Sequence, residues 1–199
     1  MSVTLIAGLG NPGREYAATR HNLGFTVVDA LAAAEKLTWK HEKRFEADVA
    51  RWAVRPGVTR WLVKPRTFMN DSGRALRRLV DFHQVPVPEL VVAYDDLTIE
   101  TGRVKVTVRG SAGGHNGVAS LLEHLGSGFV RYRLGISAPR PAGMDLKDYV
   151  LGKFSDEEQQ LIDRQLEHFV AGLRLLIESG YARAMNSLNR RDKNDTDQA

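Results

Sequence analysis

Apolar residues recur along the chain at two spacings, which predict a succession of strands and helices. Short apolar runs are typical of buried strands and occur near residues 3–7, 60–63 and 90–94. Apolar and polar residues alternate over 45–49 and 104–108, the pattern of a strand with one polar face. A further strand is expected over 131–136. Apolar residues at helical spacing predict helices over about 24–36, 71–84, 117–125 and 156–179.

This alternation of strands and helices predicts an α/β fold. We expect residues 1–188 to form a single domain with a mixed, mostly parallel central sheet covered by helices on both sides. A chain of 199 residues is long enough for one such core. The polar segment 189–199 has no periodicity, so it is expected to be a disordered tail.

Composition excludes several classes of protein. The chain has no cysteine, which rules out a disulfide scaffold, a thiolate metal site and a cysteine nucleophile. No apolar stretch approaches the roughly 18 residues of a membrane-spanning helix. The first residues also lack the basic and apolar segments of a signal peptide. We therefore expect a soluble, cytoplasmic protein.

Positive charge is concentrated in the first part of the sequence. Residues 1–110 contain 17 Lys and Arg against 12 Asp and Glu, a balance of +5, whereas 111–199 contain 11 against 12, a balance of −1. A basic surface favours a polyanionic partner such as nucleic acid, because binding releases condensed counterions. An ordinary solvated surface with a modest excess of Lys and Arg remains the alternative.

Three polar loops, 8–22, 64–73 and 109–117, each follow an expected strand. In α/β sheets such loops gather at the strand ends, so their side chains are considered together.

The first loop begins Gly8-Leu-Gly-Asn-Pro-Gly13 and formally matches a dinucleotide-binding fingerprint. That motif needs a helix to begin within the glycines, and the proline after Asn11 disfavours one. The motif also needs an acidic residue about 20 positions further on, at the end of a second strand. Glu35 is at about that distance but lies in a helical pattern. The dinucleotide interpretation is therefore rejected.

The same loops carry candidate catalytic groups. His21 suits a general base, because imidazole titrates near neutral pH. Asn70 follows Phe68 and Met69 at a helix entrance, and the glycines around Gly113 allow a ligand close approach to backbone N–H groups. Each has a structural alternative: His21 or Asn22 caps the next helix, Asn70 is a cap, and the glycine loop is a tight turn.

Other chemistries lack their motifs. Ser111 is not in a G-x-S-x-G elbow, His41-Glu42 lacks the second histidine of a zinc helix, and no P-loop lysine accompanies Asp95-Asp96. Asp95 and Asp96 are expected directly after the 90–94 strand. The simplest remaining hydrolytic chemistry is water activated by His21, with Asp95 orienting the imidazole and favouring its protonated form. No metal and no cofactor are expected.

Four signatures together resemble the bacterial peptidyl-tRNA hydrolase family. They cover about residues 3–188 in order: Gly8-Leu-Gly-Asn-Pro-Gly-x-x-Tyr16-x-x-Thr-Arg-His21-Asn-x-Gly24, Lys64-Pro-x-Thr-Phe-Met-Asn70-x-Ser-Gly73, Asp95-Asp-Leu and Gly110-Ser-x-Gly-Gly-His-Asn116-Gly117. Such agreement is very specific. The resemblance implies a monomer that hydrolyses the ester between a peptide and the terminal ribose of tRNA.

The resemblance also implies roles for individual residues. His21 would be the base, Asp95 its orienting carboxylate, and Asn11 a contact on the peptide side. The tRNA end and peptide would bind at Tyr16, Phe68, Met69, Asn70, Gly113, His115 and Asn116. Basic residues near the cleft would hold the terminal phosphate of tRNA, and Lys105 and Arg133 are the candidates. Thr107 stands where some members carry a second lysine, so the composition of this clamp departs from the family pattern.

Two other functions compete with hydrolysis. A non-catalytic RNA-binding module would use the same basic residues without needing the His21–Asp95 pair. A nicotinamide-dependent oxidoreductase would use the glycines of the first loop. An ester-cleavage assay separates the first from a hydrolase, and absence of cofactor binding would exclude the second.

Overall fold

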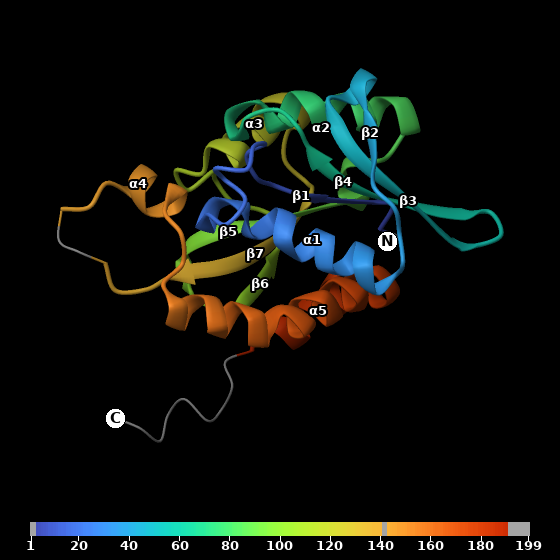
Figure 1. Ribbon diagram of the computed structural model, residues 1–199. Coiled ribbons are helices and arrows are strands. Elements are labelled where there is room, and N and C mark those ends of the chain that lie inside the picture. Colours follow the sequence, from blue (N-terminus) through green and yellow to red (C-terminus); the bar gives the residue numbers. More distant parts are fainter. Residues whose placement is uncertain (1–2, 141–142, 191–199) are drawn as a thin grey trace.

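The structure is a computed structural model that describes residues 3–140 and 143–190. Its centre is a seven-stranded sheet between two layers of helices (Figure 1), with strand order β2-β3-β4-β1-β5-β7-β6. The strands are β1 Leu5–Gly8, β2 Lys40–Glu42, β3 Ala47–Arg55, β4 Val58–Pro65, β5 Leu90–Glu100, β6 Val104–Thr107 and β7 Val130–Ser137.

The sheet is mixed, and most of its strands run in one direction. Strand β1 pairs in parallel with both β4 and β5, and β5 pairs in parallel with β7. The antiparallel pairs are β2–β3, β3–β4 and β6–β7, so β3 and β6 oppose the other five strands. The expectation of a mixed, mostly parallel sheet is confirmed.

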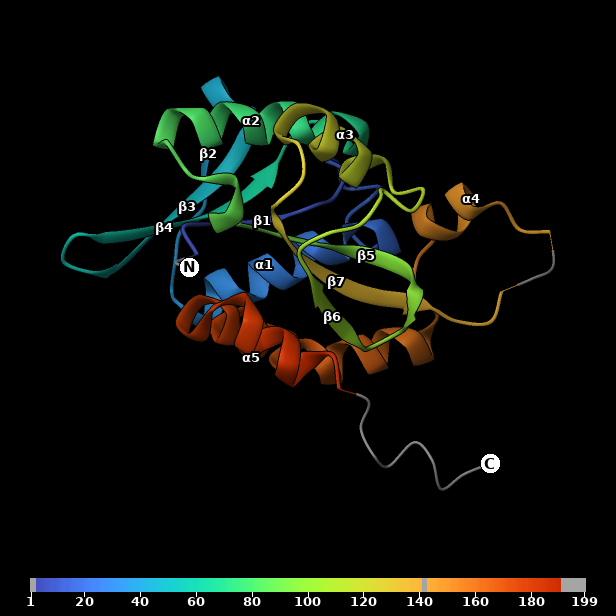
Figure 2. The same ribbon diagram turned by 180° about the vertical axis from the view of Figure 1, so that it is seen from behind.

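Helices cover both faces of this sheet. Helices α1 (Leu23–Ala34) and α5 (Asp156–Leu188) lie on one face, and α2 (Ser72–His83) and α3 (Asn116–Leu125) lie on the other (Figure 2). Helix α4 (Leu146–Leu151) stands at the end of the molecule opposite the β3–β4 hairpin. In the described part of the chain, no helix is both long and apolar enough to cross a membrane. Short 3₁₀ turns complete the fold: η1 Arg20–Asn22, η2 Lys43–Phe45, η3 Met69–Asp71 and η4 Val87–Glu89.

The two hydrophobic cores follow from the period of a strand. Successive side chains point to opposite faces of a sheet, so one strand contributes to both layers. In β1, Ile6 packs with residues of α1 and α5, whereas Leu5 and Ala7 pack with residues of α2 and α3. Burial of both faces explains why the central strands are continuous apolar runs.

Helix α1 begins unusually close to the sheet. A Cβ atom at Gly24 would lie 2.4 Å from the carbonyl oxygen of Ala93 and 2.6 Å from that of Leu9. Glycine at this position therefore allows the helix to start directly over the ends of β1 and β5. The η1 turn, which contains His21, is placed at that edge as a result.

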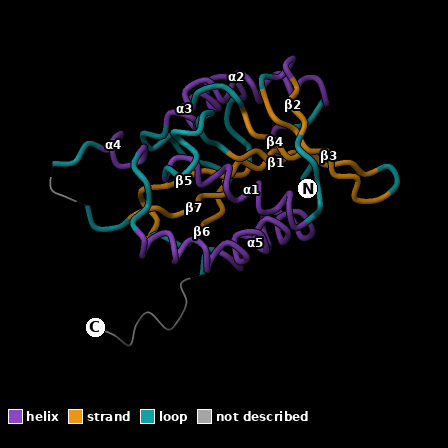
Figure 3. The backbone as a smooth tube through the Cα atoms, viewed as in Figure 1, coloured by secondary structure: helices purple, strands orange, loops and turns teal. Residues whose placement is uncertain are grey.

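Several elements differ from their predicted bounds. Strand β5 (Figure 3) does not end at Tyr94 but continues through Glu100. Asp95 and Asp96 therefore lie within a strand. The pairing with β7 includes both residues, since Asp95 pairs with Leu134 and Asp96 with Gly135. Polar residues are tolerated here because the two carboxylates have hydrogen-bond donors, His21 for Asp95 and Arg133 for Asp96. Strand β2 and helix α4 were not predicted, since one is wholly polar and the other is only six residues long.

The C-terminal helix is longer than its pattern predicts. Helix α5 continues to Leu188 across a break at Gly180, whose φ of 75° and ψ of 168° are not helical. The glycine explains why the periodic pattern stops near 179. Asn189 was assigned to a disordered tail, yet its side chain hydrogen-bonds both the backbone N–H and the carbonyl oxygen of Val106. The rest of the predicted tail, from 191 on, lies outside the described residues.

Candidate active site

The three polar loops converge on a cleft of about 770 Å³ beside the carboxyl ends of β1 and β5. The parallel pairing of these strands places Gly8 next to Ala93, two residues before Asp95. Most of the predicted site residues line this cleft: Asn11, His21, Phe68, Met69, Asn70, Asp95, Gly113, His115, Asn116 and Arg133.

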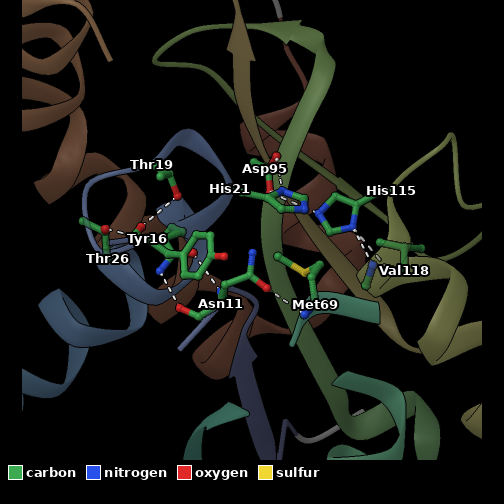
Figure 4. A network of polar contacts seen from close by, with 11 residues as sticks. Asn11, Tyr16, Thr19, His21, Thr26, Met69, Asp95, His115 and Val118 are labelled. Carbon is green, nitrogen blue, oxygen red and sulfur yellow. Dashed lines mark hydrogen bonds and ion pairs between the residues drawn. The ribbon is translucent and has the colours of Figure 1, made fainter. Parts of the chain in front are cut away.

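His21 and Asp95 form a buried hydrogen-bonded pair. The Nδ1 atom of His21 lies 2.9 and 3.0 Å from the two carboxylate oxygens of Asp95 (Figure 4). Because a carboxylate can only accept, Nδ1 carries the proton and the neutral ring keeps a lone pair on Nε2. His21 lines the cleft, so a base of the right tautomer is available there.

His115 is a second donor to the same carboxylate. Its Nδ1 atom accepts the backbone N–H groups of Gly117 (3.1 Å) and Val118 (3.3 Å), which caps the N-terminus of α3. The proton of the neutral ring therefore sits on Nε2, which donates to Asp95 Oδ1 at 3.1 Å. The sequence predicted His115 as a substrate contact, and its role as a helix cap was missed.

Asp95 is an ionised carboxylate although its side chain is only 2% exposed. Burial by itself raises the pKa of this carboxyl. Attraction to His115 and His21, together with the hydrogen bonds from both rings, outweighs burial and holds the pKa well below its usual range. The charge is therefore present at neutral pH, where it orients His21.

Asn11 joins the first loop to the second. Its Oδ1 atom accepts the backbone N–H of Met69 at 2.8 Å, and its own backbone exchanges two hydrogen bonds with the Asn22 side chain. Because Oδ1 is engaged, the Nδ2 donor is left on the cleft side, and Figure 4 draws it toward His21. Asn22 therefore holds Asn11, and its side chain does not cap α1.

Exposed aromatic and amide groups form the rim. The Phe68 side chain is 58% exposed and meets the Tyr16 ring edge-on, with centroids 6.4 Å apart. Tyr16 itself does not line the cleft but supports this ring. The Asn70 and Asn116 side chains are exposed in the cleft, and neither caps a helix through its amide. Within the described residues neither amide has a hydrogen-bond partner, so both can donate to a ligand.

The predicted phosphate clamp is only partly assembled. Lys105 lies opposite Arg133 on the β6–β7 ladder, but it does not line the cleft. Arg133 lines it and donates to Asp96 at 2.8 Å, so its charge is already balanced. Asp96 stays a carboxylate, because hydrogen bonds from Arg133 and Thr98 outweigh burial and lower its pKa.

Arg131 also lines the cleft, although the sequence pattern did not predict it there. It is 4% exposed, and its guanidinium donates to the carbonyl oxygens of Gly110 and Ser111 at 2.5 and 2.7 Å. No carboxylate pairs with it among the described residues. The available signal was its spacing of two from Arg133, which puts both side chains on one face of β7.

Other lining residues were also missed: Tyr94, Arg109, and Leu146, Lys147, Val150 and Leu151 from α4. Helix α4 is too short for a periodic pattern, so its contribution to the cleft had no signal beyond the capping Asp145.

One group of described side chains has the composition of a metal site. Atoms of His21, Asp95 and His115 that could bind a metal lie within 4.8 Å of one another. Both histidine nitrogens that face Asp95 are N–H donors, and the Nδ1 lone pair of His115 is used by the α3 cap. The donors are arranged to hydrogen-bond a carboxylate, so this set does not fit a metal without loss of the cap.

Asp95→Asn tests the electrostatics of the pair. The depressed folded-state pKa means that ionised Asp95 stabilises the fold above about pH 4, its unfolded value, and that this contribution is lost as pH falls further. We expect Asp95→Asn to lower the free energy of unfolding by about 1–3 kcal/mol at pH 7. Urea unfolding from pH 2 to 7 should show the difference from wild type shrinking below about pH 4. A constant difference would contradict this.

The comparisons with known proteins agree on one family. The family model described as Peptidyl-tRNA hydrolase matches residues 5–196. The peptidyl-tRNA hydrolase of Anaeromyxobacter sp. is 45% identical over 190 residues, covering 95% of this chain and 97% of that protein. That of Gloeobacter violaceus is 41% identical, covering 96% of each. The crystal structure of the Acinetobacter baumannii enzyme superposes with a TM-score of 0.87 at 35% identity, covering 96% of each chain. This chain is thus a member of the peptidyl-tRNA hydrolase family.

Proposed function

We propose that this protein hydrolyses the ester between peptide and tRNA with a water molecule activated by His21. The observation that carries the proposal is the hydrogen bond from His21 Nδ1 to the buried Asp95 carboxylate. It leaves Nε2 free to take a proton from water as the water attacks the ester carbonyl. Asp95 then stabilises the imidazolium that forms. The bond from the acyl carbon to the ribose oxygen then breaks, and the proton on Nε2 passes to that oxygen. The tRNA leaves with a free ribose hydroxyl, and the peptide leaves with a carboxyl group that ionises in water.

Amide donors around the cleft suit the developing oxyanion. Asn11 Nδ2 is held on the cleft side by the Met69 contact, and the Asn70 and Asn116 amides are exposed in the cleft. A preorganised donor aimed at the oxyanion stabilises the transition state more than the substrate. We assign these three asparagines to the peptide and its reacting carbonyl group.

The reaction as proposed needs no metal ion. An ester is already activated toward attack, and its leaving group is an alcohol. The only described cluster of metal-binding type uses its histidine nitrogens as hydrogen-bond donors to Asp95. General-base assistance alone contributes about 10²–10⁴-fold.

Cations on β7 and the glycine loop suit the phosphates of the tRNA end. The cleft wall includes Arg109, Arg131 and Arg133, and Arg131 has no carboxylate partner in the described structure. We therefore add Arg131 to Lys105 and Arg133 as a proposed phosphate contact, while Tyr16 and Phe68 offer an aromatic surface at the rim. The cytoplasm and a monomeric state stay predictions from the sequence.

A non-catalytic RNA-binding module is the second candidate function, favoured only by the basic wall. An RNA-binding module gives no reason for a buried carboxylate with two histidine donors. Burial of such a charge is costly unless both donors are kept. The hydrolase accounts for the wall and for the buried pair.

Replacing the base tests the mechanism. His21→Ala should lower kcat by at least about 10²-fold, because the base acts mainly in the transition state, while affinity for product tRNA changes little. Single-turnover cleavage of N-blocked aminoacyl-tRNA measures the rate. The control is His41→Ala, because His41 also hydrogen-bonds an aspartate, Asp48, but lies on β2 outside the cleft. Near-normal turnover by folded His21→Ala protein would exclude the mechanism.

Chelation tests the absence of a metal. A bound metal that activates water lowers the pKa of the water by several units, so its removal would abolish most of the rate. We expect exhaustive dialysis against EDTA to leave kcat/KM unchanged within error. A short acylated oligonucleotide is the proper substrate, since full tRNA needs magnesium for its own folding. A loss of activity that zinc or magnesium restores would overturn the proposal.

Salt dependence tests the phosphate contacts. Affinity for product tRNA should fall as salt rises, with a log–log slope of about −0.7 to −0.9 per phosphate contact. We expect Lys105→Ala and Arg131→Ala each to flatten the slope by about that amount. Arg133→Ala should do less, because Asp96 already balances its charge. Arg131→Lys keeps the charge and serves as the matched control. Affinity independent of salt would exclude a polyanionic ligand.

A further inference from the structure

Arg20 precedes His21 in the η1 turn, but its side chain contacts a different part of the chain. Its Nη1 atom donates to the carbonyl oxygens of Tyr149 (3.3 Å) and Lys153 (2.6 Å), and its Nη2 donates to Glu158 Oε2 at 2.6 Å. The guanidinium also lies over the Tyr149 ring, 4.3 Å from its centroid. The side chain is 11% exposed, so these contacts are largely shielded from water.

The segment held by Arg20 forms one wall of the cleft. Four residues of α4 line it: Leu146, Lys147, Val150 and Leu151. A helix of six residues is not stable by itself, so α4 depends on contacts with the rest of the protein. One other side-chain contact is the Tyr149 hydroxyl donating to Ile136 O at 2.6 Å, and the Arg20 backbone N–H donates to Gly152 O.

We propose that Arg20 is a positioning residue that fixes the α4 wall at a set distance from His21. These two residues are neighbours in sequence, but His21 contacts Asp95 whereas Arg20 contacts the segment that carries α4. The kinetic part of this proposal rests on the proposed function, whereas the structural part does not.

The chemistry of the contact requires arginine. Two carbonyl oxygens, one carboxylate and an aromatic face surround a single planar group, and a guanidinium can serve all four at once. The ammonium of lysine would keep the charge opposite Glu158. It cannot reproduce the fork of donors or stack its plane on Tyr149.

Loss of Arg20 should affect binding of the substrate more than the chemical step. His21 is held independently by two contacts with Asp95, so the base stays in place without the Arg20 side chain. No hydrogen bond joins α4 to His21 or Asp95 in the described structure, so we assign the α4 wall to parts of the substrate away from the reacting atoms. Removing binding that is equal in ground and transition states raises KM and leaves kcat unchanged.

The test compares Arg20→Met, which keeps the length of the side chain, with wild type. We expect KM for N-blocked aminoacyl-tRNA to rise by about 10-fold or more, with kcat changed by less than about threefold. Hydrogen exchange of backbone amides should speed up over 146–153 and stay unchanged over 90–96 of β5. Arg20→Lys should give a KM and an exchange rate over 146–153 between those of wild type and Arg20→Met. It replaces Arg20→Met in the test if that variant does not fold.

The matched control is Arg174→Met. Arg174 lies on α5, outside the cleft, and likewise donates to a carboxylate, that of Glu35, at 2.6 Å. It should change neither KM nor the exchange of α4. Unchanged KM and unchanged exchange in Arg20→Met would overturn the proposal, as would a fall in kcat at constant KM. If His21→Ala instead kept full activity, the proposed function would fail, while faster exchange over 146–153 would still show that Arg20 holds α4.

Discussion

A single buried carboxylate, that of Asp95, is the group on which the arrangement of the site depends. Burial of an ion is costly unless hydrogen bonds compensate it, and here two imidazole rings do so from two different loops. One ring belongs to the turn after β1, and the other caps α3. The need to satisfy one charge thus fixes two loops that are far apart in sequence.

The same requirement settles the proton positions. His115 donates to Asp95 through Nε2, because its Nδ1 atom already accepts the N–H groups at the start of α3. The α3 cap therefore fixes the tautomer of His115, and the ionised Asp95 carboxylate, which can only accept, fixes that of His21. The start of α3 and the candidate base are thus joined through one shared carboxylate.

Much of this arrangement was readable from the sequence. Alternating apolar runs predicted the sheet and its four main helices, and the polar loops after the strands predicted that His21 and Asp95 would meet. Contacts that depend on three-dimensional geometry were not readable. Nothing in the pattern indicates that β5 continues past Asp95, because polar residues in a strand are tolerated only where partners from other loops reach them. The six residues of α4 carry no period, so the sequence gives no sign that this helix lines the cleft.

Asn189 illustrates how the end of the chain serves the sheet. Its amide binds the N–H and the carbonyl group of Val106 at 2.7 and 2.8 Å, as a neighbouring strand would. Strand β6 is the outer edge of the sheet, and exposed edge groups of this kind invite pairing with another molecule. The side chain therefore satisfies edge groups of Val106 that a strand of another molecule would otherwise pair with. Helix α5 thus covers one face of the sheet and, through the residue that follows its last turn, also closes part of the edge of the sheet.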